Sequence, residues 1–186
     1  MKSKIPVREM ALAAMGAALT AVCSWISIPA PGGVPFTLQT FAVCLLTALS
    51  GWKLGLCTVA VYLLLGAVGA PVFAGFKGGA GALLGTTGGY LLGFLFTALI
   101  TGLLADKVSR RFPLLLLWMA LGLAVCYAFG TAWFVWLYAK NTGPVSVAAA
   151  LGWCVFPFLL PDAVKLTLAA LLAGRLYPFI KRGRSQ

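Results

Sequence analysis

Residues 113–138 read PLLLLWMALGLAVCYAFGTAWFVWLY, a run without a single charged side chain. About 20 mostly apolar residues are enough for a helix to cross the hydrocarbon core of a bilayer. The whole chain has the same character, because 62% of its 186 residues are hydrophobic and only 9% are charged. A soluble domain carries about 25% charged residues. The sequence therefore predicts an integral membrane protein whose main solvent is lipid.

Apolar segments continue on both sides of this run, and we expect each to form a membrane-crossing helix. Two of them are short and are separated only by residues 51–53. The six expected helices cover Met10–Ile28, Thr37–Ser50, Leu54–Ala70, Gly85–Ala105, Pro113–Tyr138 and Val147–Leu176. The predicted fold is an all-α integral membrane protein with six transmembrane helices in a single domain, residues 1–186.

The positive charges are divided unequally between the two sides of the expected membrane. Six passes put both termini on one side, and cytoplasmic loops carry the excess of Lys and Arg. The tails and loops on the side of the termini hold Lys2, Lys4, Arg8, Lys53, Lys107, Arg110, Arg111, Arg175, Lys181, Arg182 and Arg184. The opposite loops hold only Lys77 and Lys140. We therefore expect a cell-membrane protein with both termini in the cytoplasm.

The scarcity of acids and the lack of histidine exclude most kinds of catalytic site. Glu9, Asp106 and Asp162 are the only acidic residues, and they are far apart in the chain. No paired carboxylates, Ser-His-Asp triad or histidine-based metal site can be assembled from them. The cations stand between apolar runs instead of on one polar face, which argues against nucleic-acid binding. We expect no enzyme activity, no metal and no cofactor.

Two polar stretches lie on the side opposite the termini. Residues 32–40, GGVPFTLQT, precede or open the second helix, and helix capping accounts for Thr37 but not for Gln39. Residues 69–90 contain eight glycines, so we expect an irregular glycine-rich outer loop between the third and fourth helices. A flexible linker is the alternative, but Phe73, Phe76 and Tyr90 are untypical of one.

The third polar stretch, FPFLLPDAVK at residues 156–165, lies inside the last apolar segment. Its two prolines are expected to break or kink the helix, with Pro161 restarting it. Asp162 and Lys165 are three residues apart and therefore share a helix face. A charge in mid-membrane costs about 2.5–3.5 kcal/mol, and such residues normally face a cavity or a partner. Both a structural ion pair and a ligand site fit this pattern.

Depth places all three stretches on the outer side of the membrane. Asp162 precedes Arg175 by 13 residues, which is about 20 Å of helix in a core about 30 Å thick. Irregular backbone within a membrane is tolerated where it lines a cavity. The three stretches together predict one outward-facing binding pocket.

The first helix carries alanines at the four-residue spacing that lets two helices approach closely. The pairs are Ala13/Ala17, Ala14/Ala18 and Ala17/Ala21. The neighbouring helix belongs either to this chain or to another protein, and the spacing fits both.

In this order and together, the motifs resemble the BioY family, the biotin-binding S components of energy-coupling factor (ECF) transporters. The resemblance spans nearly the whole chain and rests on its length, the six apolar segments, Val34–Thr40, Gly78–Tyr90 and Pro161–Lys165. It implies a protein that captures biotin from outside with high affinity. It also implies partners, namely a transmembrane coupling protein and a pair of ATP-hydrolysing subunits.

The resemblance assigns the binding of biotin to residues in the three polar stretches. These are Thr37, Gln39, Phe73, Lys77, Gly78, Gly79, Thr87, Tyr90, Asp162 and Lys165. It also implies that the first helix docks on the coupling protein, for which we choose Ala14 and Ala18. The chain departs from the family at Thr86, where proline is common, and at Leu91, where other members carry a basic residue. We expect Lys77 to replace that basic residue as a partner of the biotin carboxylate.

Three other functions stay open from the sequence. They are an S component for another vitamin, a small membrane enzyme, and a structural partner of a membrane complex. An enzyme could use only Asp162 and Lys165 as reactive groups. A structural partner would tolerate mutation of the outer polar stretches.

Overall fold

The computed structural model describes residues 7–30 and 33–184, and the side chains of these residues as far as Ile180. Lys2, Lys4 and Gly32, which contributed to the expectations above, lie outside the described residues. The elements are α1 (Val7–Trp25), β1 (Ser27–Ile28), β2 (Phe36–Thr37), α2 (Gln39–Ser50), α3 (Trp52–Ala67), the 3-10 helix η2 (Ala74–Phe76), α4 (Ala80–Leu84), α5 (Gly88–Lys107), α6 (Phe112–Asn141), α7 (Val147–Cys154) and α8 (Phe156–Arg184).

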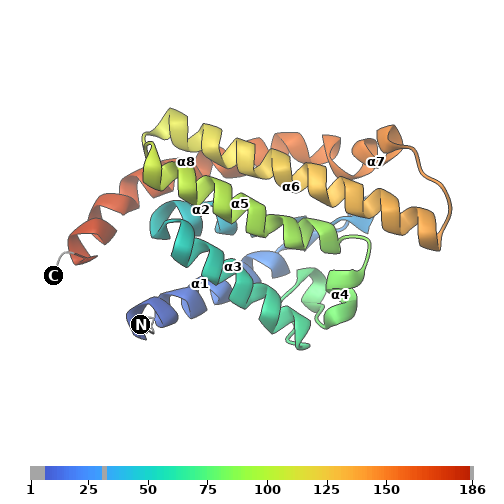
Figure 1. Cartoon of the computed structure of the whole chain (residues 1–186), viewed down its shortest axis with the longest axis horizontal. Helices are drawn as coiled ribbons and strands as arrows, with labels where there is room; N and C mark the ends of the chain where they lie inside the picture. The colour runs from blue at the N-terminus through green and yellow to red at the C-terminus, as the bar shows by residue number, and fades with distance from the viewer. Residues whose placement is uncertain (1–6, 31–32, 185–186) are drawn as a thin grey trace.

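The helices form an elongated bundle in which the long helices run roughly along one direction (Figure 1). Helix α5 packs along α6, α3 contacts both α1 and α5, and α2 packs against α8 and α5. Both ends of the chain lie at the end of the bundle that carries the α5–α6 connection, on the left of Figure 1. Helix α4 and the α6–α7 connection lie at the opposite end. The polar stretches between α3 and α5 are therefore remote from the termini.

Four helices of the described chain are long and apolar enough to cross a membrane: α1, α5, α6 and residues 156–180 of α8. Helices α2 and α3 are also apolar, but they have only 12 and 16 residues. The prediction of a mostly helical membrane protein is confirmed at this level. The apolar side chains that α1, α6 and α8 leave exposed are those expected to face lipid.

Two helix boundaries differ from the sequence expectation because a short antiparallel pair intervenes. Strands β1 and β2 pair Ser27 with Thr37 and Ile28 with Phe36. Helix α1 therefore ends at Trp25, and α2 begins two residues later than Thr37. Strands of two residues carry no periodic signal, so this pair could not be expected from the sequence.

The last apolar segment is interrupted at a different place from the one predicted. Helix α7 ends at Cys154, and α8 runs without interruption from Phe156 through Pro161. The expectation that Pro161 restarts the helix is wrong. Pro157 is the second residue of α8, where a backbone N–H has no partner within the helix. Pro161 removes only one hydrogen bond of the first turns, which the long helix tolerates.

A polar junction fixes the turn between α2 and α3 at the end of the bundle near the termini. Gly51 has a φ of +85° and leaves room for the carboxylate of Asp106, which accepts a hydrogen bond from Trp52 N at 3.0 Å. Arg110 pairs with the same carboxylate and lies over the ring of Tyr177 at 4.1 Å. The first turn of α3, the end of α5 and the end of α8 are thus joined.

Candidate functional site

A cavity of about 570 Å³ opens among α2, α5, α6, α8 and the connection between α3 and α5. This volume lies in the range of about 300–1,000 Å³ that is typical of small-molecule sites. The residues around it are Gly33, Val34, Pro35, Thr37, Gln39, Thr40, Phe73, Ala74, Lys77, Gly78, Gly81, Ala82, Gly85, Thr86, Thr87, Tyr90, Leu91, Phe94, Leu123, Cys126, Tyr127, Cys154, Phe158, Asp162 and Lys165. All three polar stretches of the sequence contribute to it.

Asp162 and Lys165 form an ion pair in the wall that α8 contributes to the cavity. Lys165 Nζ lies 2.7 Å from Asp162 Oδ1, and the two side chains are only 12% and 4% exposed. The other carboxylate oxygen, Oδ2, accepts a hydrogen bond from the hydroxyl of Tyr127 on α6. A buried charge without a partner is strongly unfavourable. The ammonium of Lys165 and the hydroxyl of Tyr127 thus each donate to one oxygen of the carboxylate that borders the cavity.

Gln39 places a polar amide at the start of α2, next to the cavity. Its Nε2 donates to the hydroxyl of Tyr62, and that hydroxyl donates to the carbonyl of Val72 at 3.1 Å. Its Oε1 accepts from the hydroxyl of Thr37 at 2.9 Å. The amide orientation is therefore fixed by partners on both sides. Leu38 is the N-cap residue of α2 and has no side-chain cap bond, but Thr37 Oγ1 accepts from Gln39 N at 3.3 Å.

The connection after α3 folds back so that Phe73 and Lys77 reach the cavity. Their backbones form an isolated antiparallel bridge, with Phe73 N donating to the carbonyl of Lys77 at 2.9 Å. The Phe73 ring is buried and sits over Gly66, where a Cβ would collide with it. The residue Lys77 is exposed, at the rim. An apolar wall and a cation accessible to solvent thus come from one short turn.

Two residues at the end of α1 hold this connection in place. The Ser24 hydroxyl donates to the Val72 carbonyl at 2.5 Å, and Trp25 Nε1 donates to the Pro71 carbonyl at 2.8 Å. The Trp25 ring stacks on Phe76 with the centroids 5.1 Å apart. The loop that borders the cavity is therefore fixed to α1.

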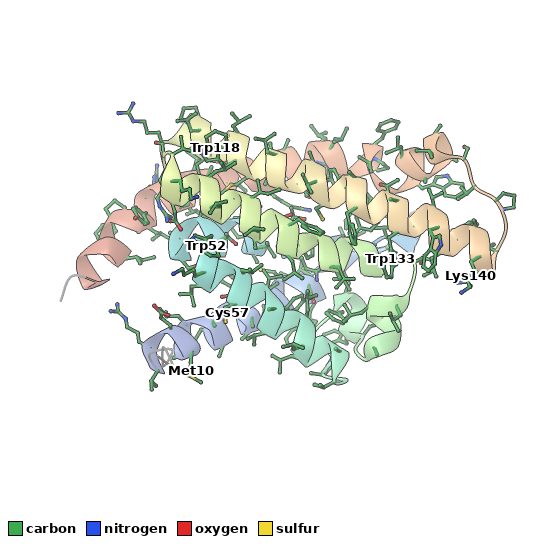
Figure 2. The ribbon with its side chains drawn as sticks, in the orientation of Figure 1. Met10, Trp52, Cys57, Trp118, Trp133 and Lys140 are labelled. Carbon is green, nitrogen blue, oxygen red and sulfur yellow. The ribbon has the colours of Figure 1, made fainter. Side chains whose placement is uncertain are left out.

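The beginning of α5 supplies Thr87 and Tyr90. The Tyr90 hydroxyl is 3.0 Å from the hydroxyl of Thr131 on α6, and the Tyr90 ring lies directly against Gly130. Any side chain at position 130 would displace this ring. Close approach of α5 and α6 thus depends on a glycine in the middle of α6. In the same region Trp133, seen near the α4–α5 connection in Figure 2, donates from Nε1 to the Gly85 carbonyl at 3.0 Å.

The structure brings nine of the ten expected site residues to the cavity, and Gly79 is the exception. Gly79 has a φ of +93°, and its N–H donates to the Gly66 carbonyl at 2.7 Å. This glycine shapes the loop without bordering the cavity. Phe36 stacks on Phe158, with the centroids of the two rings 4.2 Å apart. Phe158 is the ring that borders the cavity.

Tyr127 is the main residue that sequence reasoning missed. It stands in the middle of the uncharged run at 113–138, where an aromatic residue resembles its apolar neighbours. Its position near the middle of a membrane helix could have identified it, because tyrosines in membrane helices prefer the interfaces. A buried tyrosine hydroxyl normally finds a hydrogen-bond partner, and the only acid in an apolar segment is Asp162.

The alanines of α1 lie apart from the cavity and divide into two faces. Ala13, Ala17 and Ala21 are buried inside the bundle, so this part of the stripe packs within the chain. Ala14 and Ala18 are exposed on the outer face of α1.

Chemically, the cavity combines one carboxylate, two ammonium groups, an amide, hydroxyls and aromatic walls. No group of three His, Cys, Asp or Glu residues that could hold a metal occurs among residues 7–30 and 33–184. The arrangement suits a small organic ligand that has N–H donors, an apolar body and a negative charge. Binding and orientation, not acid–base catalysis, are what these groups can provide.

Comparisons with known proteins converge on one family. The model of the BioY family matches residues 1–182. A biotin transporter BioY of Thermotoga maritima is 44% identical over 170 residues, covering 91% of this chain and 96% of that protein. A probable biotin transporter BioY of Pyrococcus horikoshii is 41% identical over 169 residues, with the same coverage. The crystal structure of an S component for biotin from an ECF-type ABC transporter superposes with a TM-score of 0.80 at 25% identity, covering 95% of this chain and 94% of that one.

Proposed function

The chain belongs to the BioY family, and from that premise we propose that it captures biotin as the S component of an ECF-type vitamin transporter. The observation that carries the proposal is the buried Asp162–Lys165 pair bordering a cavity of ligand size. A charge pair in an apolar segment is retained where a cavity or partner uses it. The relatives are named transporters, not enzymes, and binding without catalysis agrees with the groups in the cavity.

The chemistry of biotin matches the distribution of polar groups. Its ureido ring has two N–H donors and one carbonyl, and a carboxylate ends its apolar chain. The Asp162 carboxylate can accept from N–H donors, and Lys165 and Lys77 can pair with anionic or carbonyl oxygens. Phe73 and Tyr90 provide apolar surface between these charges. We assign the ligand carboxylate to Lys77, because Lys165 is already paired with Asp162.

Transport requires an energy source that this chain does not contain. The sequence has no GxxxxGK[ST] nucleotide motif. The energy therefore comes from partners, which we propose to be a transmembrane coupling protein and ATP-hydrolysing subunits. Ala14 and Ala18 support docking on α1, because they leave a small-residue surface exposed on its outer face.

We further propose that the chain crosses the membrane six times with both termini in the cytoplasm. Helices α1, α2, α3, α5, α6 and α8 supply the passes, and α2 and α3 are the short ones. The arrangement in Figure 1 supports this, because the two termini lie together at one end of the bundle and α4 lies at the other. The cavity then opens to the outside between the ends of these helices.

A ligand panel tests the function most simply. Thermal unfolding of the purified protein should shift upward with biotin and stay unchanged with riboflavin or thiamine, because a ligand that binds only the folded state stabilises it. Stabilisation by another vitamin alone would assign a different substrate. No shift with any of them, together with tolerance of mutations around the cavity, would favour a structural role.

A further inference from the structure

The Asp162 carboxylate is held by two helices at once. Lys165, on the same helix, donates to Oδ1 at 2.7 Å, while Tyr127 reaches across from α6 and donates to Oδ2. Both Tyr127 and Asp162 border the cavity. Each oxygen of the carboxylate therefore has one donor from the protein, and the two donors fix the plane of the group.

We propose that Tyr127 is a positioning residue for ligand binding, which it serves by keeping the Asp162 carboxylate turned toward the cavity. The inference rests on the proposed capture of biotin. A carboxylate has about four lone-pair sites, and the two protein donors use one site on each oxygen. One site on each oxygen is left, which suits a ligand that presents N–H donors.

Without the Tyr127 hydroxyl, the freed Oδ2 has another donor within reach. Lys165 carries an ammonium with three N–H donors, so the carboxylate can turn and share both oxygens with it. In this turned state both oxygens of the Asp162 carboxylate face the Lys165 ammonium. The carboxylate is then no longer available to accept hydrogen bonds from a ligand in the cavity.

The expected effect follows from the populations of the two orientations. When only a fraction of the protein has the competent orientation, the apparent Kd rises by the inverse of that fraction. Removing one hydrogen bond to a charged group changes such an equilibrium by about tenfold or more. Tyr127→Phe should therefore weaken biotin binding about tenfold, while the ring keeps its packing.

A double-mutant cycle distinguishes positioning from general support of the fold. Biotin affinity is measured for the wild type, Tyr127→Phe, Asp162→Asn and the double variant. Tyr127→Phe should have no further effect in the Asp162→Asn protein, because the group that it positions is already gone. Equal losses in both backgrounds would overturn the inference. Tyr138→Phe is the matched control, because Tyr138 stacks on Phe134 and does not border the cavity, and it should bind like the wild type.

Two further results complete the test. Placing 4-aminophenylalanine at position 127 restores a donor at the end of the ring and should recover most of the affinity lost in Tyr127→Phe. Wild-type affinity in Tyr127→Phe, or binding by the 4-amino protein as weak as that of the phenylalanine variant, would refute the role of the hydroxyl. Failure of the wild type itself to bind biotin would instead refute the proposed function, on which the inference rests.

Discussion

We expect the specificity for an anionic ligand to depend on Lys77. It lies on the turn that also carries Phe73, and it is exposed at the rim of the cavity. The other two charged residues around the cavity, Asp162 and Lys165, are paired with each other. A ligand that brings a carboxylate to the rim would therefore meet a cation that the ion pair leaves unused.

Lys77→Met should weaken the binding of biotin about fivefold, because a partly exposed charge pair contributes up to about 1 kcal/mol. Binding of biotin amide, which lacks the carboxylate, should stay the same. Lys140→Met is the control, since Lys140 is the other cation expected in an outer loop and lies over the ring of Trp136, away from the cavity. Calorimetric titration measures the six combinations of the wild type and the two variants with biotin and biotin amide. An equal loss for biotin and its amide would exclude Lys77 as the partner of the carboxylate.

At the residue scale, the sequence indicated those site residues whose charge or polarity differs from that of their neighbours in the chain. Asp162 and Lys165 stand out because charges are rare in apolar segments, and the structure brings both to the cavity. Tyr127 and Phe158 do not contrast with the apolar residues around them. Their roles follow only from the crossing of α6 and α8, which no local pattern contains.

At the scale of the elements, the connection after α3 depends on the end of α1. Ser24 and Trp25 donate to two successive carbonyls of that connection. The same connection brings Phe73 and Lys77 to the cavity. Loss of a contact at α1 should therefore affect ligand binding although α1 itself does not border the cavity.

Ser24→Ala should lower the free energy of unfolding by about 1 kcal/mol, the usual contribution of one hydrogen bond. Biotin affinity should also fall, because the bordering loop becomes less well fixed. Thr167→Ala is a suitable control, since the Thr167 hydroxyl donates to the Ala163 carbonyl on an exposed face of α8. Thermal unfolding and calorimetry of the three proteins provide the comparison. A Ser24→Ala protein that matched Thr167→Ala in both measurements would show that the hydrogen bond from Ser24 to the Val72 carbonyl is dispensable.

The contact between α5 and α6 provides a second test at this scale. Gly130→Ala adds a Cβ that collides with the Tyr90 ring, and overpacking of this kind costs about 1–3 kcal/mol. Gly174→Ala adds the same group where no heavy atom lies within 4 Å, so its stability should change by less than about 0.5 kcal/mol. The midpoints of thermal unfolding of the two variants, measured in the same detergent, test this difference in stability. Similar midpoints for the two variants would contradict the close packing at Gly130.

At the scale of the elements, the existence of the long helices can be predicted from the sequence, but the place where the last apolar segment is interrupted cannot. Long apolar runs require helices in a membrane, which is why α1, α5, α6 and α8 could be expected from hydropathy. The break before α8 occurs at Val155 and not at the prolines. A proline in the first turn of a helix costs no hydrogen bond, so its position alone does not determine where the helix ends.

For the whole molecule, the distribution of charge and the arrangement of the helices both support the proposed orientation in the membrane. Lys53 is in the first turn of α3, Lys107 is the last residue of α5, and Arg110 and Arg111 lie in the connection from α5 to α6. These helix ends belong to the end of the bundle that also holds the termini, whereas Lys140 lies near the opposite end (Figures 1 and 2). An excess of Lys and Arg marks the cytoplasmic side of a membrane protein. In the orientation proposed above, the cavity opens to the outside of the membrane.

Reporter fusions test this orientation directly. A fluorescent protein that folds only in the cytoplasm should be active at both the N- and the C-terminus, and alkaline phosphatase should be inactive at both. The control is phosphatase inserted after Asn141, at the end of α6, where it should be active. Opposite results at the two termini would require an odd number of passes.

Capture of biotin by this cavity is tested most directly by an equilibrium titration of the purified protein with biotin, carried out alongside Asp162→Asn and Lys165→Met. We expect saturable binding of one biotin per chain in the wild type. Both variants should bind at least about tenfold more weakly, because each removes a charged hydrogen-bonding partner in a buried site. Absence of binding at micromolar biotin in the folded wild type, or unchanged affinity in both variants, would contradict the claim that this cavity captures biotin.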